Sequence, residues 1–147
     1  MRIREAGAED ILSIGLIERE SFSDPWGSRE FSTALESSQT IFLVAEDATG
    51  VVAGYAIAIA VADEAEILNL AVHGQKRQHG IGGKLLDSTV EKVRLRGAEQ
   101  IYLEVRESNE AARKLYTSRG FGEVTRRRKY YRNPVEDALV LRLAMQR

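Results

Sequence analysis

The 147-residue chain contains no cysteine. This absence excludes disulfide bridges, thiolate metal ligands and a cysteine nucleophile. The sequence also lacks internal repeats, low-complexity tracts and linkers, and its length suits one compact unit with a hydrophobic core. Residues 1–147 are therefore predicted to form a single domain.

An excess of charge of one sign is missing as well. The 21 basic and 22 acidic residues leave a net charge of −1, so any anion-binding site must be local. The longest apolar run, residues 51–62, contains Gly54 and is too short to span a bilayer. The first ten residues, MRIREAGAED, contain no apolar signal core. A cytoplasmic location is the default expectation.

The hydrophobic pattern and the turn residues predict an α/β (α+β) fold, in which helices cover both faces of a mixed sheet of about seven strands. Asp10 is predicted to cap the first helix, and Gly97 and Gly120 are predicted to end two later helices. Strands are expected at residues 2–5, 41–46, 51–61, 64–72, 100–105, 121–131 and 138–143, and helices at residues 10–21, 28–36, 81–96 and 109–119.

Three glycines and several basic groups crowd the segment KRQHGIGGKLL, residues 76–86, at the predicted start of a helix. Helix N-termini bind phosphate because their first N–H groups lack intrahelical partners and the helix dipole is positive there. The pattern Arg77-x-x-Gly80-x-Gly82 fits a pyrophosphate loop. It fits equally well a turn that only lets a helix pack closely on a sheet.

Two other phosphate-binding motifs are excluded. A nucleotide-binding P-loop would need a glycine at Gln78 and a magnesium-binding hydroxyl at Leu85. Leu85 also stands where a dinucleotide fingerprint has its third glycine.

Glu104 is the unexpected residue of the strand at 100–105. Alternation along this strand points Tyr102 and Glu104 away from the face that carries the three aliphatic residues. A strand covered by helices on both faces is apolar on both, so a carboxylate there needs an explanation. A solvated edge, a salt bridge with Arg106 or a role in chemistry would each provide one.

Asn109 and Tyr116 are two helical turns apart in the next predicted helix, so their side chains project along the same line. Asn109 also suits a helix N-cap, and Tyr116 suits a place in the core. Each residue therefore has a structural alternative to a functional role.

Seven segments in one order carry a resemblance that runs over nearly the whole chain. Together they resemble one branch of the GNAT superfamily, the ribosomal-protein-alanine N-acetyltransferases. The segments are DPW (24–26), DEAEILNLAV (63–72), the glycine loop, LEVRESN (103–109), LYTSRGF (115–121), YY (130–131) and EDAL (136–139). The resemblance implies a GNAT fold, acetyl-coenzyme A as cosubstrate, no metal, and the N-terminal alanine of a small-subunit ribosomal protein as acceptor.

By this resemblance Glu104 is the general base and Tyr116 is the general acid. The residues implied to contact acetyl-coenzyme A are the backbone of Leu70, Ala71 and Val72 along the acetyl and pantetheine arm, the loop residues Arg77, Gln78, His79, Gly80, Ile81 and Gly82 at the pyrophosphate, and Asn109. Gly74 and Gly27 depart from the proline and the serine or threonine usual in the family. Both lie in expected loops, so they bear on loop rigidity and substrate fit rather than on the chemistry.

Acetyl transfer to an amine makes chemical demands that this set would meet. A free α-amino group has a pKa of about 7.7–8.0, so most of it must lose a proton before it attacks a thioester. A carboxylate with a pKa raised by burial can take that proton, directly or through a water. A strand amide near Leu70–Val72 could stabilise the oxyanion, and a tyrosine could protonate the departing thiolate. No acyl-enzyme is needed, in agreement with the missing cysteine.

Two other kinds of function stay open. RGFGEVTR, residues 119–126, partly matches an RNA-recognition motif, but Glu123 and Arg126 replace the aromatic residues that would stack on bases. The second alternative is a GNAT enzyme that acetylates a small-molecule amine or a protein lysine. Trp26, Tyr130 and Tyr131 are expected either to wall a groove for an extended peptide or to pack in the core. Direct contact with nucleic acid or with a membrane is not expected.

Overall fold

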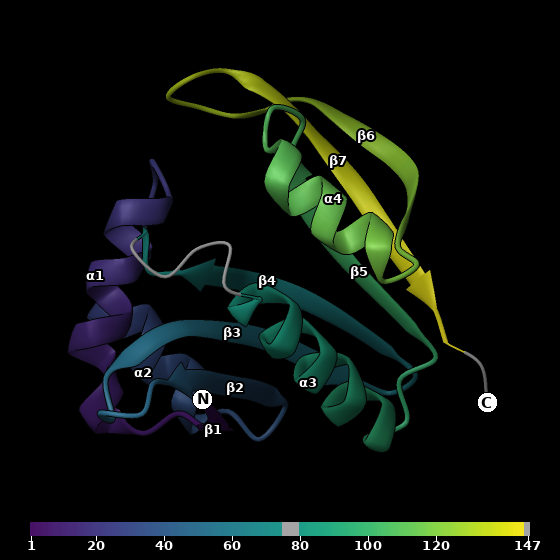
Figure 1. The fold of residues 1–147 in the computed structure, drawn as a ribbon. Helices are drawn as coiled ribbons and strands as arrows, with labels where there is room; N and C mark the ends of the chain where they lie inside the picture. Colours follow the sequence, from purple (N-terminus) through teal and green to yellow (C-terminus); the bar gives the residue numbers. More distant parts are fainter. Residues whose placement is uncertain (75–79, 146–147) are drawn as a thin grey trace.

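The computed structural model describes residues 1–74 and 80–145, and the strands among them form one seven-stranded sheet in the order β1-β2-β3-β4-β5-β7-β6 (Figure 1). β4 and β5 run parallel, and the other neighbouring strands are antiparallel. The strands are β1 (Arg2–Glu5), β2 (Thr40–Glu46), β3 (Val52–Val61), β4 (Glu64–Val72), β5 (Gln100–Arg106), β6 (Gly122–Tyr131) and β7 (Glu136–Ala144). The helices are the 3-10 helix η1 (Ala8–Asp10) and α1 (Ile11–Ser21), α2 (Ser28–Glu36), α3 (Ile81–Leu95) and α4 (Glu110–Ser118). The predicted mixed sheet is confirmed.

Helices α3 and α4 cover one face of the sheet, and α1 and α2 cover the other, as predicted (Figure 1). Alternation along β2 shows why both faces are apolar. Ile41 and Leu43 pack into the core under α3, whereas Phe42 and Val44 pack into the core under α1 and α2. None of the described helices is long and apolar enough to cross a membrane.

Helix boundaries follow the predicted residues with one exception. Gly97 and Gly120 follow the ends of α3 and α4 and have φ angles of 99° and 93°, the left-handed conformation that ends a helix. Asp10 makes no side-chain cap to α1. Its carboxylate instead accepts a hydrogen bond from the Gly7 N–H at 2.8 Å and forms an ion pair with Arg4 at 2.8 Å. The predicted cap is wrong because these two partners engage the carboxylate.

β4 and β5 separate partway along their length. They pair only as far as Ile67 and Leu103. Leu68 is the extra residue of a β-bulge, because the pairing of β4 with β3 passes directly from Ile67 to Asn69. A bulge bends its strand, and beyond it β4 and β5 diverge (Figure 1). The candidate site lies in the gap between them.

Candidate active site

A cavity of about 350 Å³, the gap cavity, lies between the diverging ends of β4 and β5. Its walls include Leu70 of β4, Glu104 of β5 and Tyr116 of α4. Glu104 and Tyr116 approach from opposite faces of β5, because Tyr116 packs in the core with Leu103 and Glu104 points the other way. The structure nevertheless brings the predicted base and the predicted acid to one cavity.

Tyr116 reaches the gap cavity from the buried side of α4. Its ring lies edge-on to Phe121, with the ring centroids 5.7 Å apart. Burial and, to a smaller extent, the neighbouring Tyr131 raise the pKa of Tyr116 above the usual value for a phenol. The hydroxyl therefore stays protonated at neutral pH.

Glu104 reaches the gap cavity from the opposite face. Its side chain is 21% exposed, and its Oε1 lies 3.2 Å from Nε of Arg127. Arg106 instead pairs with Glu136 at 3.0 Å, so the alternative of a salt bridge between Glu104 and Arg106 is wrong. Arg127 lies on β6, which is separated from β5 by β7, so the ion pair reaches across one strand of the sheet.

Glu66 and Tyr130 lie close to Glu104, and Glu66 was not singled out from the sequence. Burial and then the charge of Glu104 raise the pKa of Glu66, while Arg127 opposes this shift. The charge of Glu104, ahead of burial, raises the pKa of Tyr130. The available sequence signal was the alternation of β4, which puts Glu66 on the same face of the sheet as Glu104.

A second cavity, of about 780 Å³, opens on the face of the sheet that carries Glu104. This open-face cavity is lined by Trp26, Tyr130 and Tyr131 as well as Glu104. The three aromatic residues expected to wall a groove thus lie around one cavity. Trp26 also packs against Phe31, with the ring centroids 5.5 Å apart, so it contacts the core as well.

Glu18 lines the open-face cavity and is a second residue that sequence reasoning missed. Its side chain is almost fully buried. The carboxylate accepts hydrogen bonds from the Tyr55 hydroxyl, from the Asn69 side-chain amide at 3.1 Å and from the Trp26 backbone N–H at 2.9 Å. These bonds connect α1 and the segment after it to β3 and to β4 just beyond the bulge. A carboxylate within the apolar stripe of α1 was the signal that could have revealed this cluster.

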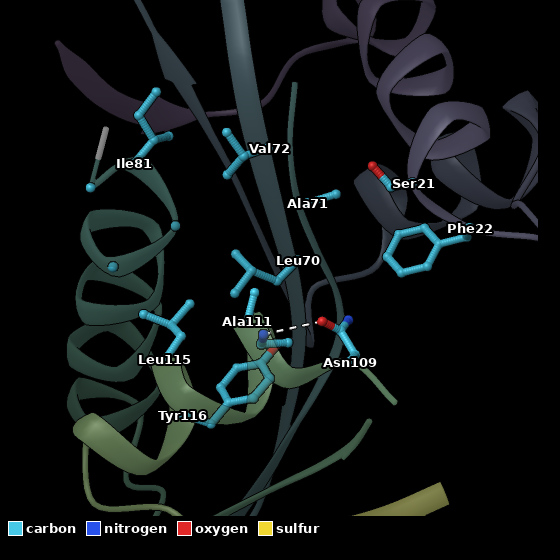
Figure 2. Close-up of a pocket in the computed structure, with 14 residues that line it drawn as sticks. Ser21, Phe22, Leu70, Ala71, Val72, Ile81, Asn109, Ala111, Leu115 and Tyr116 are labelled. Atoms are coloured by element: carbon cyan, nitrogen blue, oxygen red, sulfur yellow. Dashed lines mark hydrogen bonds between the residues drawn. The ribbon is translucent and has the colours of Figure 1, made fainter. Parts of the chain in front are cut away.

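A third cavity, of about 580 Å³, lies between β4 and the start of α3 (Figure 2). This helix-side cavity is lined by every described residue that was predicted to contact the cofactor, namely Leu70, Ala71, Val72, Gly80, Ile81, Gly82 and Asn109. Arg77, Gln78 and His79 lie outside the described residues. Figure 2 shows Tyr116 and Leu115 of α4 on the same wall of this cavity.

The first turn of α3 borders the helix-side cavity. Gly80 precedes α3 with a φ of 78°, and no described side chain caps the helix. The first N–H groups of α3 therefore offer an attractive position for an anion. A Cβ on Gly82 would lie 3.4 Å from Leu115 and 3.7 Å from Val72, which are ordinary contact distances. Close packing of α3 therefore does not by itself require a glycine at this position.

Asn109 and the backbone of β4 complete the wall. Asn109 accepts a hydrogen bond from the Ala112 N–H at 3.1 Å, which confirms the predicted N-cap (dashed line in Figure 2). The His73 N–H donates to the Ala53 carbonyl of β3 at 2.7 Å. Since amide directions alternate along a strand, the N–H of Leu70 points away from β3, toward the gap. An amide in this direction can stabilise a developing oxyanion.

The three cavities share walls across the sheet. The helix-side and gap cavities share Leu70, Asn109 and Tyr116. The open-face and gap cavities share Asn69, Glu104 and Tyr131. Ligands that enter from opposite faces can therefore meet in the gap, between a carboxylate and a phenol. This arrangement suits the transfer of a group from one ligand to the other.

Comparisons with known proteins agree with this geometry. The model of the acetyltransferase (GNAT) family matches residues 11–121. The [ribosomal protein bS18]-alanine N-acetyltransferase of Escherichia coli strain K12 is 36% identical over 129 residues, which cover 86% of each protein. The enzyme of the same name from Salmonella typhimurium strain LT2 is 36% identical over 137 residues, which cover 91% of this chain and 90% of that protein.

A solved structure is similarly close. The crystal structure of the ribosomal-protein-S18-alanine N-acetyltransferase from Escherichia coli matches with a TM-score of 0.91 and 32% identity, covering 99% of this chain and 94% of that one. The family model spans most of the chain, and the relatives cover most of it at more than 30% identity. This chain therefore belongs to the GNAT family of acetyltransferases.

Proposed function

We propose that this enzyme transfers an acetyl group from acetyl-coenzyme A to the N-terminal α-amino group of a protein, specifically the N-terminal alanine of a small-subunit ribosomal protein. The observation that carries the proposal is the gap cavity, which is lined by both Glu104 and Tyr116. It shares walls with the helix-side cavity on one face of the sheet and with the open-face cavity on the other. The names of the relatives at 36% identity support the alanine and the ribosomal acceptor. Residues 1–147 would act as one N-acetyltransferase domain in the cytoplasm, where ribosomal proteins are made.

The helix-side cavity suits acetyl-coenzyme A. The N–H groups at the start of α3, including those of Ile81 and Gly82, suit the negatively charged diphosphate. The apolar residues Leu70–Val72 suit the pantetheine arm, and the acetyl group would then lie at the gap, beside the Leu70 amide. The remaining contacts in this proposal are those expected for Arg77, Gln78, His79, Gly80 and Asn109.

The open-face cavity suits the acceptor. Trp26, Tyr130 and Tyr131 offer apolar rings with polar groups at their edges, which suits an extended peptide. Glu104 lies where this cavity meets the gap. The α-amino group at the end of an acceptor peptide would reach Glu104 before any other part of that peptide.

In the proposed reaction, Glu104 takes a proton from the acceptor's ammonium group, directly or through a water, and leaves a neutral amine. The amine attacks the acetyl carbonyl and forms the new C–N bond, while the Leu70 N–H stabilises the oxyanion. The attacking nitrogen loses its second proton to solvent, the C–S bond breaks, and the Tyr116 hydroxyl protonates the leaving thiolate. Tyr116 then regains a proton from solvent.

A mass-spectrometric assay with acetyl-coenzyme A tests the proposal. The panel contains peptides with a free N-terminal Ala, Ser, Met or Gly, a peptide with a blocked N-terminus and an internal lysine, and small-molecule amines. We expect acetylation of free N-termini, fastest at alanine. Acetylation confined to the lysine peptide or to the small amines would favour the other kinds of GNAT activity instead.

A further inference from the structure

We infer that, in the free enzyme, Arg127 is paired with Glu104 and competes with the acceptor's ammonium group for that carboxylate. This inference rests on the proposed function, in which Glu104 receives the amine. Arg127 then sets the apparent affinity for the acceptor and takes no part in the chemical step.

The ion pair engages the carboxylate that the amine must reach. Nε of Arg127 lies 3.2 Å from Oε1 of Glu104, a hydrogen-bonding distance for a charged pair. Arg127 lines a separate cavity of about 650 Å³ on this face of the sheet, together with Glu66 and Glu104, and it lines neither the open-face cavity nor the gap cavity. An acceptor ammonium that reaches Glu104 from the gap therefore meets a carboxylate that is already paired with a guanidinium.

Arg127 is held loosely enough to leave. Its side chain is 57% exposed, and its guanidinium lies 5.4 Å from the centroid of the Tyr130 ring. The register of β6 with β7 shifts between Arg127 and Tyr131, and β6 is solvent-exposed over nearly its whole length. An exposed ion pair of this kind changes an equilibrium by a factor of about five at most. The contacts of a bound peptide can therefore supply the free energy needed to displace Arg127 from Glu104.

The other charged groups near Glu104 do not take the place of Arg127. Glu66 adds negative charge, which makes the position more attractive to a cation. Arg106, the cation on the same strand as Glu104, is held by a different carboxylate at 3.0 Å and lies 4.4 Å from the centroid of the Tyr131 ring. Within the part of the chain that the structure describes, Arg127 is thus the cation paired with Glu104.

Steady-state kinetics at saturating acetyl-coenzyme A test the inference, with the N-terminal alanine peptide as the varied substrate. Arg127→Gln removes the competing charge, so the KM for the peptide should fall about two- to fivefold, while kcat stays within about twofold of the wild-type value. Arg127→Lys keeps the charge and should keep the wild-type KM. Arg128→Gln, the matched control, removes a neighbouring exposed charge and should also leave the KM unchanged.

An unchanged or higher peptide KM in Arg127→Gln would overturn the inference. A loss of kcat of roughly tenfold or more would overturn it as well, because Arg127 would then position Glu104 for the chemical step. A wild-type enzyme that acetylates none of the peptides would instead overturn the proposed function, and this inference with it. Thermal unfolding followed by circular dichroism confirms that each variant is folded.

Discussion

At the scale of single residues, the candidate site combines two ionisable groups in contrasting surroundings. Tyr116 is enclosed between α4 and the core, and this burial raises its pKa. Glu104 lies on the open face of the sheet, where it meets Arg127 and Glu66. A phenol that retains its proton suits a general acid, and a carboxylate that is open to an incoming ammonium suits a general base.

Glu104→Gln and Tyr116→Phe should each lower kcat by about 10²–10⁴, the usual contribution of an acid or a base. Both substitutions nearly preserve the size of the side chain, so the affinity for coenzyme A in calorimetry should stay close to the wild-type value. Tyr102→Phe, on the same strand as Glu104, is the matched control and should keep the wild-type kcat. If both site variants retain wild-type kcat at saturating substrates, the acid–base assignment is wrong.

The sequence alone could place these two residues but not their partners. The alternation of β5 correctly predicted the direction of Glu104, because the pattern is local to one strand. The pairing of Glu104 with Arg127 depends on how β6 is placed in the sheet relative to β5, with β7 between them, and no local pattern contains that information. Arg106, two residues away in the sequence, was therefore the more obvious candidate and the wrong one.

At the scale of elements, the glycine turn and α3 form the wall of the helix-side cavity. The hydrophobic pattern predicted this helix and its end at Gly97, because an amphipathic stripe and a left-handed glycine are both readable locally. The β-bulge at Leu68 was not predictable, because it is defined by the pairing of β4 with β3. The gap between β4 and β5 follows from that bulge, so the position of the gap could not be predicted from the sequence either.

Gly82→Glu should abolish the binding of coenzyme A in calorimetry without unfolding the protein. The new Cβ would meet Leu115 and Val72 at 3.4 and 3.7 Å, which are ordinary contact distances. The carboxylate, however, would put a negative charge at the start of α3, where the diphosphate is proposed to lie. Gly82→Ala adds the same Cβ without the charge and should still bind coenzyme A. Equal binding by the glutamate variant would remove α3 from the proposed cofactor site.

At the scale of the whole molecule, the sheet separates two entrances that meet in the gap cavity. The order of elements predicted the mixed sheet and the helices on both faces, since each element buries one recognisable apolar face. The position of the gap cavity, where the two entrances meet, could not be predicted from the order of elements. Glu18 illustrates the reason, because its hydrogen-bond partners Tyr55 and Asn69 lie far from it in the sequence and become neighbours only when the sheet has formed.

The most direct test of this arrangement is a crystal structure of the enzyme with coenzyme A and a peptide that begins with alanine. We predict that the diphosphate lies at the N–H groups that begin α3, and that the sulfur lies in the gap between Glu104 and Tyr116. The amino terminus of the peptide should approach from the open-face cavity, with Arg127 displaced from Glu104. A sulfur outside the gap, or both ligands bound on the same face of the sheet, would contradict the proposed mechanism.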